Sequence, residues 1–396
     1  MRPKHGGNLA WAAALAGCPP DAILDFSASI SPLGPPKSAI AAIQAHLGNL
    51  SYYPDPDYRE LRAALSQLHQ LPPEWILPGN GSAELLTWAG WDLAKLAACA
   101  LVTPAFGDYW RALRAFDAKV VEWPLDLGSR ELFLEQGELF LEQGEQGEIV
   151  QKDYLFVHSS LASPASPASP APPAFFFPCS LLRAPCSLAG LLLNNPHNPT
   201  GKLFLRETVL PYLEQFALVV VDEAFMDFLP PDREQSLIPV VQKYPNLVIL
   251  RSLTKFYSLP GLRLGYAIAH PDRLRRWQQW RDPWPVNTLA AAAAAAVVQD
   301  TEFQQQTWAW LAPARLHLFE GLDQIPGLQP YESAANFLLV QSQQPSSQVQ
   351  QQLLKNHQIL IRDCLSFPSL GDRYFRVAVR SNTENERLVQ ALSHGS

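Results

Sequence analysis

The amino-acid sequence predicts an α/β fold, because short apolar runs alternate with segments of helical periodicity. Apolar runs bounded by turn residues occur at CALVTP, YLFVHSS, GLLLNNP, ALVVVDEAF and LVILRSL. Runs of this length with helical patterns between them are typical of a parallel sheet that is covered on both faces. Ligands bind such sheets beyond the carboxyl ends of the strands, so we expect the functional residues there.

Helical periodicity predicts several of the elements that cover this sheet. Residues 58–69 (YRELRAALSQLH) and 82–96 (SAELLTWAGWDLAKL) repeat apolar residues at helical spacing. The alanine run at 290–296 predicts a tightly packed helix.

The C-terminal part of the chain predicts a smaller α+β unit. From about residue 300 it contains a helical segment, a strand at 336–342, a helix in SQVQQQLLKNHQ, strands in ILIRDC and YFRVAVRS, and a last helix. We therefore expect a large domain at 51–300 and a small domain at 301–396. The N-terminal arm, residues 1–50, is expected to form part of the small domain.

Residues 127–188 differ in character from the rest of the chain. The sequence ELFLEQG occurs twice in tandem, at 131–137 and 138–144, and ASPASPASPAPP follows. Closely spaced prolines prevent a helix or a central strand. Apart from the candidate strand YLFVHSS, we expect most of this region to be a surface insertion.

Composition and charge limit the classes of function. A chain of 396 residues with 47% hydrophobic content can bury a large core. Its net charge of −7 argues against a nucleic acid or an acidic membrane as partner, because such binding needs a concentrated basic surface. A small molecule is the expected partner.

The cysteines and the N-terminus indicate a cytoplasmic protein. Five cysteines without a CxxC pair fit neither a disulfide framework nor a zinc site, so no metal is expected. The N-terminus MRPKHGGNLAWAAALAGC has the outline of a secretory signal, but its apolar run is short and follows Gly-Gly-Asn. No apolar stretch reaches the roughly 18 residues that span a bilayer.

The segment SLTKFYSLPGLRLG, residues 252–265, has two interpretations. Lys255 follows a buried apolar run, with hydroxyls at Ser252 and Thr254 and a guanidinium at Arg263. The first interpretation is a surface turn with ordinary cations. The second is a Schiff-base lysine beside a phosphate site, because a desolvated amine has a lowered pKa and a guanidinium fork suits a phosphate dianion.

Three further segments carry polar residues where ligands are expected. GNGSAELL (79–86) is a Gly-rich turn that opens a helix, which is either a phosphate site or a plain cap. NNPHNPTG (194–201) is a rigid turn that either directs an amide toward the sheet edge or only reverses the chain. VVVDEAF ends in Asp222, whose carboxylate suits a metal ligand, a general base or the partner of a protonated heterocycle.

These segments, in this order, resemble the fold-type-I enzymes of the class I/II aminotransferase family, which use pyridoxal 5'-phosphate. The resemblance covers nearly the whole chain except most of 127–188. It implies a large domain with a mainly parallel, seven-stranded type of sheet flanked by helices. It also implies a homodimer with shared active sites.

The resemblance implies roles for residues around the cofactor ring. Lys255 would bond covalently to the cofactor, and Asp222 would pair with the protonated pyridine nitrogen, which makes the ring an electron sink. The same resemblance implies that Asn198 bonds the 3-oxygen of the ring and that Phe106, in TPAFGDY, stacks on its face.

The resemblance further implies which residues hold the cofactor phosphate and the substrate carboxylate. The phosphate would be bound by Gly81, Ser82, Ser252 and Arg263, with Tyr53 from the neighbouring subunit. Arg376, in YFRVAVR, matches the residue that binds the substrate carboxylate. Without the resemblance, Arg376 would be interpreted as a cation on an edge strand.

Two groups within this family share most of the motifs: histidinol-phosphate aminotransferases and the threonine-phosphate decarboxylases of cobalamin synthesis. The segments HGGN (5–8) and ILDFSASISPLGPP (23–36) resemble the decarboxylases more. Phe225 does too, because the transaminases usually have Tyr there. A non-catalytic cofactor-binding protein is the third hypothesis.

The sequence therefore favours decarboxylation of L-threonine O-3-phosphate to (R)-1-aminopropan-2-yl phosphate. His5 and Asn8 are candidates for binding the phosphate of this substrate, the alternative being a flexible polar tail. Ser29 and Ser31 depart from the pattern FSANINPLG expected in the decarboxylases, so contacts from that loop should be weaker or displaced.

Overall fold

The computed structural model describes residues 5–125 and 185–393. The described residues all belong to one compact unit, so the domain boundaries expected near 50 and 300 remain a prediction. Both ELFLEQG repeats and the candidate strand YLFVHSS lie outside the described residues.

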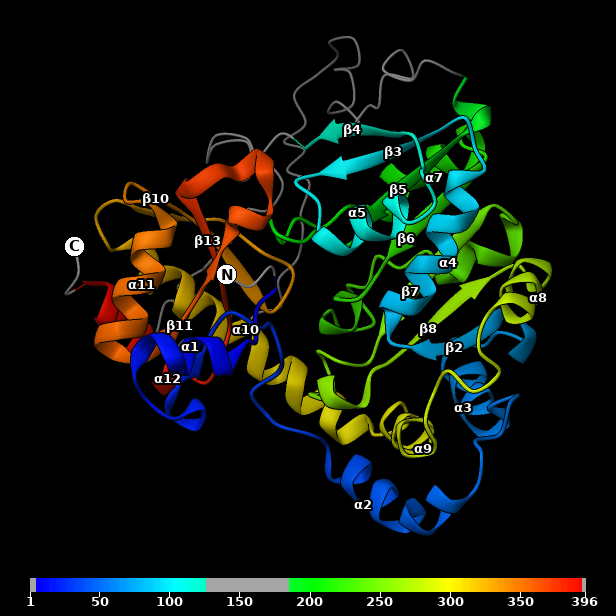
Figure 1. The fold of residues 1–396 in the computed structure, drawn as a ribbon, viewed down its shortest axis with the longest axis horizontal. Coiled ribbons are helices and arrows are strands. Elements are labelled where there is room, and N and C mark those ends of the chain that lie inside the picture. The colour runs from blue at the N-terminus through cyan, green and yellow to red at the C-terminus, as the bar shows by residue number, and fades with distance from the viewer. Residues whose placement is uncertain (1–4, 126–184, 394–396) are drawn as a thin grey trace, which may run out of the picture. The chain divides into compact units, whose positions relative to one another are not determined.

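A seven-stranded sheet forms the centre of the part of the chain that the structure describes (Figure 1). Its order is β2-β8-β7-β6-β5-β3-β4, and β8 is antiparallel to both of its neighbours while the other neighbouring pairs are parallel. This confirms the predicted mainly parallel sheet. Its strands are β2 (Ile76–Asn80), β3 (Ala98–Thr103), β4 (Val120–Pro124), β5 (Ala189–Asn194), β6 (Leu218–Asp222), β7 (Leu247–Ser252) and β8 (Leu264–Ala269).

The strands at the centre of this sheet are buried along their whole length, which explains their continuous apolar sequences. Apolar side chains of α4 pack against this sheet together with Trp277, which is completely buried. At their carboxyl ends β5, β6 and β7 change to polar residues, namely Asn194, Asp222 and Ser252. The core thus ends where the candidate site begins.

Helices surround the sheet, and the predicted ones are found. The segments expected at 58–69 and 82–96 are α3 and α4, and the alanine run lies in α9, where most of its alanines are buried. Small side chains let α2 pack closely against α9. The helices of this region are α2 (Lys37–His46), α3 (Arg59–His69), α4 (Ser82–Ala94), α5 (Gly107–Arg114), α7 (Arg206–Gln215), α8 (Pro271–Trp280) and α9 (Thr288–Val297).

The C-terminal residues form a four-stranded antiparallel sheet in the order β12-β13-β10-β9. The predicted strand ILIRDC is divided, because β11 pairs with β1 of the N-terminal arm whereas β12 pairs with β13. The N-terminal arm therefore contributes a strand that pairs with the C-terminal part of the chain. The elements are α1 (Leu9–Ala16), β1 (Leu24–Asp25), α10 (Thr301–Asp323), β9 (Leu328–Pro330), β10 (Phe337–Ser342), α11 (Ser346–His357), β11 (Ile359–Leu360), β12 (Arg362–Asp363), β13 (Tyr374–Ala378) and α12 (Asn382–Ser393).

The cysteines require one correction. Cys186 is disulfide-bonded, although the number and spacing of the cysteines did not indicate a disulfide. Pairing depends on which thiols the fold brings within bonding distance, and spacing in the sequence does not report that. Cys18, Cys99 and Cys364 are free. Among the helices of the described ranges, we find none with the length and apolar character to cross a membrane.

Candidate active site

Lys255 lies just beyond the end of β7, in a segment that is tied to the N-terminal arm. Its carbonyl oxygen accepts a hydrogen bond from the Ser31 N–H at 3.0 Å. Its Nζ lies 5.0 Å from the centre of the Phe225 ring. Burial lowers the pKa of Lys255 to about 8, with Arg376 and Arg263 lowering it further and Asp222 opposing them. A neutral amine is thus available near neutral pH, as a nucleophile requires.

Asp222 is the last residue of β6, and its carboxylate is buried and held by two donors. The Tyr109 hydroxyl on α5 donates to Oδ2 at 2.9 Å, and the Ala224 N–H donates to Oδ1 at 3.0 Å. Burial raises the pKa of Asp222, while Lys255 and the Tyr109 hydrogen bond oppose the rise. The carboxylate is therefore held in place by these two donors, and it lies close enough to Lys255 for the two charges to interact.

Glu223, the next residue, points to the opposite side of the sheet, because successive strand residues alternate. It is fully buried and accepts hydrogen bonds from Ser236 Oγ at 2.6 Å and from Arg251 Nε at 3.0 Å. Arg251 also pairs with Asp227 and Glu234. Glu223 thus belongs to a structural charge cluster, and Asp222 alone of the two acids faces the candidate site.

Two glycines, which have no side chain, let Arg263 and β8 lie close to the start of α4. A Cβ on Gly81, whose φ is +74°, would lie 2.8 Å from Arg263 Nη2, and a Cβ on Gly265 would lie 2.5 Å from the Ser82 nitrogen. The free backbone N–H groups of this 13-residue helix and the adjacent guanidinium therefore form a cradle for an anion. The Ser252 hydroxyl, at the end of β7, is within hydrogen-bond distance (2.7 Å) of the Thr254 hydroxyl.

Arg376 on β13 connects the C-terminal sheet to the NNPHNPTG turn. Its Nη1 donates to Asn198 Oδ1 at 2.5 Å, and its guanidinium lies 4.5 Å from the centre of the Phe337 ring. Burial lowers the pKa of Arg376 to about 10, and the charge of Arg362 adds to this effect. An anion at this position would relieve the repulsion between the two guanidinium groups.

Arg362 is a residue that the motifs did not single out. It is buried on β12, directly opposite Arg376 in the antiparallel register. Pairing the predicted strand ILIRDC with YFRVAVRS would have placed two arginines together, but the register is not evident from the sequence.

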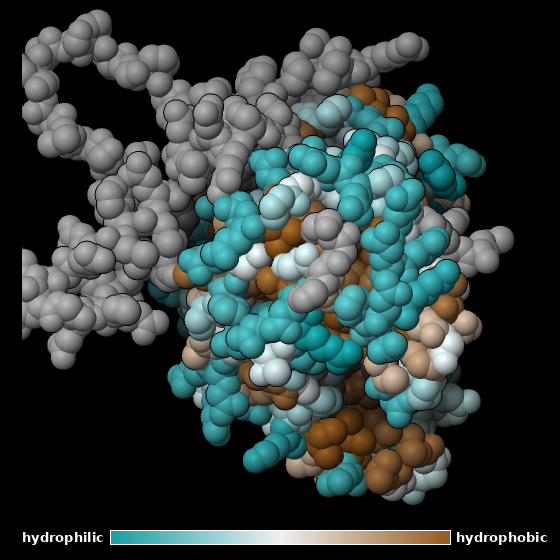
Figure 2. Space-filling view, turned by 90° about the vertical axis from the view of Figure 1, so that its left-hand side faces the viewer, coloured by the Kyte–Doolittle hydropathy of each residue, from teal (hydrophilic) through white to brown (hydrophobic). Residues whose placement is uncertain are grey.

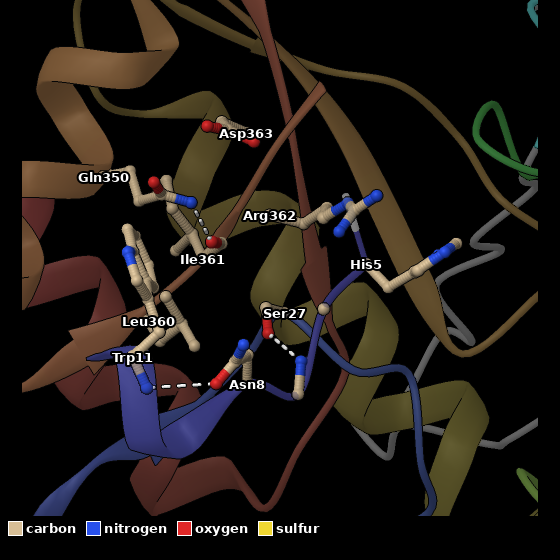
Figure 3. Close-up of a pocket in the computed structure, with 11 residues that line it drawn as sticks. His5, Asn8, Trp11, Ser27, Gln350, Leu360, Ile361, Arg362 and Asp363 are labelled. Carbon is tan, nitrogen blue, oxygen red and sulfur yellow. Dashed lines mark hydrogen bonds between the residues drawn. The ribbon is translucent and has the colours of Figure 1, made fainter. Parts of the chain in front are cut away.

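The N-terminal arm reaches the same region. The ring of His5 meets the Phe106 ring edge-on, with 5.6 Å between the centroids. His5 and Arg362 line one cavity, and Figure 3 shows the Arg362 side chain extending toward His5. Asn8 lines it too, but its side chain accepts from the Trp11 N–H at 3.0 Å and caps α1.

Tyr53 is not joined to these residues within the chain. It is 78% exposed and stacks on Trp284, with 4.3 Å between the ring centroids. The remaining predicted residues converge on the carboxyl edge of the sheet, the start of α4 and the adjoining face of the C-terminal sheet.

A family model for aminotransferases of class I and II matches residues 21–392 of the chain. The chain belongs to the class I and II aminotransferase family. This confirms the predicted family and fold, and with them pyridoxal 5'-phosphate as the cofactor.

Relatives within this aminotransferase family include both groups expected from the sequence. The threonine-phosphate decarboxylase of Salmonella typhimurium is 37% identical over 400 residues, which cover 98% of this chain and 95% of that protein. The histidinol-phosphate aminotransferase of Symbiobacterium thermophilum is 31% identical over 366 residues, covering 91% and 87%. The solved histidinol-phosphate aminotransferase of Clostridium acetobutylicum aligns with a TM-score of 0.76 and 25% identity, covering 94% of this chain and 99% of that one.

The residues present fit the cofactor of this family. The glycine cradle beside Arg263 has the shape and charge for its phosphate. The Lys255 amine has a lowered pKa, as a covalent bond to an aldehyde requires. Asp222 supplies a buried, oriented carboxylate for a protonated ring nitrogen.

Proposed function

We propose that the chain is a pyridoxal-phosphate-dependent lyase that decarboxylates L-threonine O-3-phosphate. The products are carbon dioxide and (R)-1-aminopropan-2-yl phosphate, which serves the nucleotide loop of cobalamin. The observation that carries the choice of reaction is Phe225, which is buried with its ring 5.0 Å from Lys255 Nζ. Similarity over nearly the full length to the Salmonella decarboxylase supports the same choice.

The proposal assigns the cofactor contacts to the residues that converge at the sheet edge. When bound, pyridoxal phosphate supplies an electron sink for the bond that breaks at Cα. Asp222 would hold the proton on the ring nitrogen, and Phe106 would cover one ring face. Asn198 uses Oδ1 to accept from Arg376, so its Nδ2 group would donate to the 3-oxygen. Gly81, Ser82, Ser252 and Arg263 would bind the phosphate.

The two buried arginines and the arm would bind the substrate. Arg376 suits the carboxylate, and Arg362 together with His5 suits the phosphate, because guanidinium forks match both groups. Asn8 already caps α1 with its side chain, so we propose that it acts by holding the arm.

Lys255 and Phe225 would determine what happens at Cα of the substrate after its bond to the carboxylate breaks. After carbon dioxide leaves, the Lys255 ammonium group would return a proton to Cα. Phe225 and Phe337 are both buried and meet edge-on, with 5.0 Å between their centroids, so they exclude water beside the amine. A tyrosine at position 225 would instead bring a hydroxyl group to this apolar surface.

We further propose a homodimer in which Tyr53 reaches the cofactor phosphate of the partner. Exposed apolar side chains support this: Leu47, Leu50, Tyr52, Tyr53 and Trp284 are all at least 40% exposed. Figure 2 shows a group of hydrophobic residues at the lower end of the molecule, the end at which α2 lies in Figure 1. We also propose a cytoplasmic location, which the free thiols of Cys18, Cys99 and Cys364 support and the disulfide at Cys186 does not.

Product analysis tests the reaction. With bound cofactor and threonine phosphate, and without an oxo acid, we expect carbon dioxide and aminopropanol phosphate in equal amounts. Phe225→Tyr should lower this rate by about tenfold, the effect of roughly one misplaced hydrogen bond. Lys255→Ala is the inactive control.

Transamination of histidinol phosphate with an oxo acid, without carbon dioxide from threonine phosphate, would overturn the proposal. It would favour the second candidate, a histidinol-phosphate aminotransferase, which similarity to the Symbiobacterium enzyme supports. Cofactor binding without turnover of either substrate would leave the non-catalytic hypothesis.

A further inference from the structure

A short series of hydrogen bonds attaches the N-terminal arm to the segment that follows β1. The Gly7 N–H donates to Ser27 Oγ at 2.8 Å, and Ser27 Oγ donates to Asp25 Oδ1 at 2.6 Å. The same carboxylate oxygen also accepts from the Ser27 N–H at 2.7 Å. Figure 3 shows the bond from the arm to Ser27 at the edge of the cavity. The Asp25 carboxylate thereby orients the hydroxyl that holds the arm.

The two glycines of the arm are required by this attachment. A Cβ on Gly6 would lie 2.2 Å from the Ser27 carbonyl oxygen, closer than any side chain can approach. Gly7 has a φ of +80°, a conformation that glycine adopts without steric cost. The HGGN pattern is thus explained by close contact between the arm and the backbone at Ser27.

The base of this attachment is rigid. Phe26 is buried between two strands: its N–H donates to the Leu360 carbonyl at 2.8 Å, and its carbonyl accepts from the Ala378 N–H at 2.9 Å. Arg380 Nη1 donates to the Asp25 carbonyl at 3.1 Å. Asp25 and Ser27 therefore flank a residue that is held by β11 on one side and by β13 on the other.

The free end of the arm reaches the site. His5 lies two residues from Gly7 and contacts the ring of Phe106, the residue that directly precedes α5. His5 also shares its cavity with Arg362 and Ser27. The position of His5 over the site hence depends on how Gly7 is held.

We propose that Asp25 and Ser27 are positioning residues that hold the N-terminal arm across the site and so place His5 for the phosphate of the substrate. The role toward the substrate rests on the proposed function, whereas the hold on the arm does not. Loss of the Ser27 hydroxyl frees the Gly7 N–H and lets the arm leave the Phe106 ring.

Hydrogen exchange, followed by mass spectrometry on the full chain without substrate, tests the hold directly. Ser27→Ala should speed exchange in the peptide that contains Gly7 on the order of fivefold, the effect of one hydrogen bond. Ser29→Ala is the matched control, because the buried Ser29 hydroxyl has no hydrogen-bond partner among the described residues. Unchanged exchange in β13 shows that each variant is folded.

Gly6→Ala is an independent variant. Its Cβ would push the arm away from the backbone at Ser27, while the hydroxyls of Ser27 and Ser29 remain. It should speed exchange in the same peptide. Equal exchange in Ser27→Ala and the unchanged protein, or equal acceleration by Ser29→Ala, would overturn the proposal.

Kinetics with threonine phosphate test the consequence for the site. Ser27→Ala should raise KM about fivefold with kcat nearly unchanged, because the arm contributes binding and not chemistry. A loss of kcat at constant KM would contradict the positioning role. If the unchanged protein does not act on threonine phosphate, the proposed function fails while the exchange result still decides the hold on the arm.

Discussion

Lys255 obtains its properties from side chains that are distant in the sequence. Phe225 lies against its amine, Asp222 faces it, and Arg263 and Arg376 add positive charge nearby. Burial removes water that would stabilise the ammonium form, and the two guanidinium groups disfavour it further. Asp222 limits the shift, so the amine keeps a pKa of about 8.

This pKa predicts the pH dependence of cofactor attachment. Because only the neutral amine attacks an aldehyde, the rate at which cofactor-free protein acquires its visible absorption band should rise with pH and reach half its maximum near the lowered pKa of about 8. Stopped-flow absorbance between about pH 6 and pH 10 measures this rate. With the ordinary lysine pKa of about 10.4, the rate would rise only at a much higher pH.

Two variants sharpen the measurement. Arg376→Gln removes a cation that lowers the pKa of Lys255, so the midpoint should move to higher pH. Arg114→Gln, which changes an exposed arginine of α5, should leave it unmoved. A midpoint near the ordinary lysine pKa in the unchanged protein would refute the explanation by burial.

At the scale of elements, the phosphate cradle depends on how closely β8 approaches the start of α4. Gly265 lies opposite Ser252 in the antiparallel register, and its missing side chain leaves room for the Ser82 N–H. Gly81 gives the same room to Arg263. The cradle is therefore a contact between a strand and a helix that only glycine permits.

Gly265→Ala should weaken cofactor binding on the order of tenfold or more, because overpacking of this contact costs about 1–3 kcal/mol. Gly261→Ala is the matched control in the same segment, since no atom lies within 4 Å of the added Cβ. Titration of the cofactor-free proteins, followed by absorbance, gives both dissociation constants. Equal dissociation constants would show that the approach of β8 to α4 is not needed.

At the scale of the whole molecule, several large apolar side chains are exposed on one surface. Leu50 and Tyr53 are 62% and 78% exposed, and Trp284 stacks on Tyr53. Such a group of apolar side chains indicates an interface. Since Tyr53 does not reach the cradle of its own chain, a second copy is the occupant that we propose.

Leu50→Asp should raise the dissociation constant of the homodimer at least about tenfold, because burying an unpaired carboxylate costs more than the roughly 1–3 kcal/mol of an unpaired neutral polar group. Leu205→Asp places the same charge at another exposed leucine, at the start of α7, and should leave the dimer intact. Sedimentation at several concentrations measures both. A monomeric unchanged protein would contradict the shared site.

Much of the fold and the site could be predicted from local patterns. The apolar runs of β3, β5, β6 and β7 are continuous because these strands are buried on both faces, so they are visible in the sequence. β2, β4 and β8 were not predicted: β2 contains Pro78 and Gly79, and β4 is only partly buried. Local signals weaken where a strand lies at an edge or carries glycine.

The features of the site also fall into two groups, those that the sequence indicates and those that depend on the tertiary structure. The sequence by itself determined the family, and it singled out Lys255, Asp222 and the turn at Gly81 as candidates, because each of these lies in a short motif whose chemistry is local. Only the tertiary structure decided that Tyr109 holds Asp222, that Arg362 lies beside Arg376, and that Ser27 holds the arm. These contacts join residues that are far apart in the chain, and their geometry depends on strand register and helix packing, which no local pattern records.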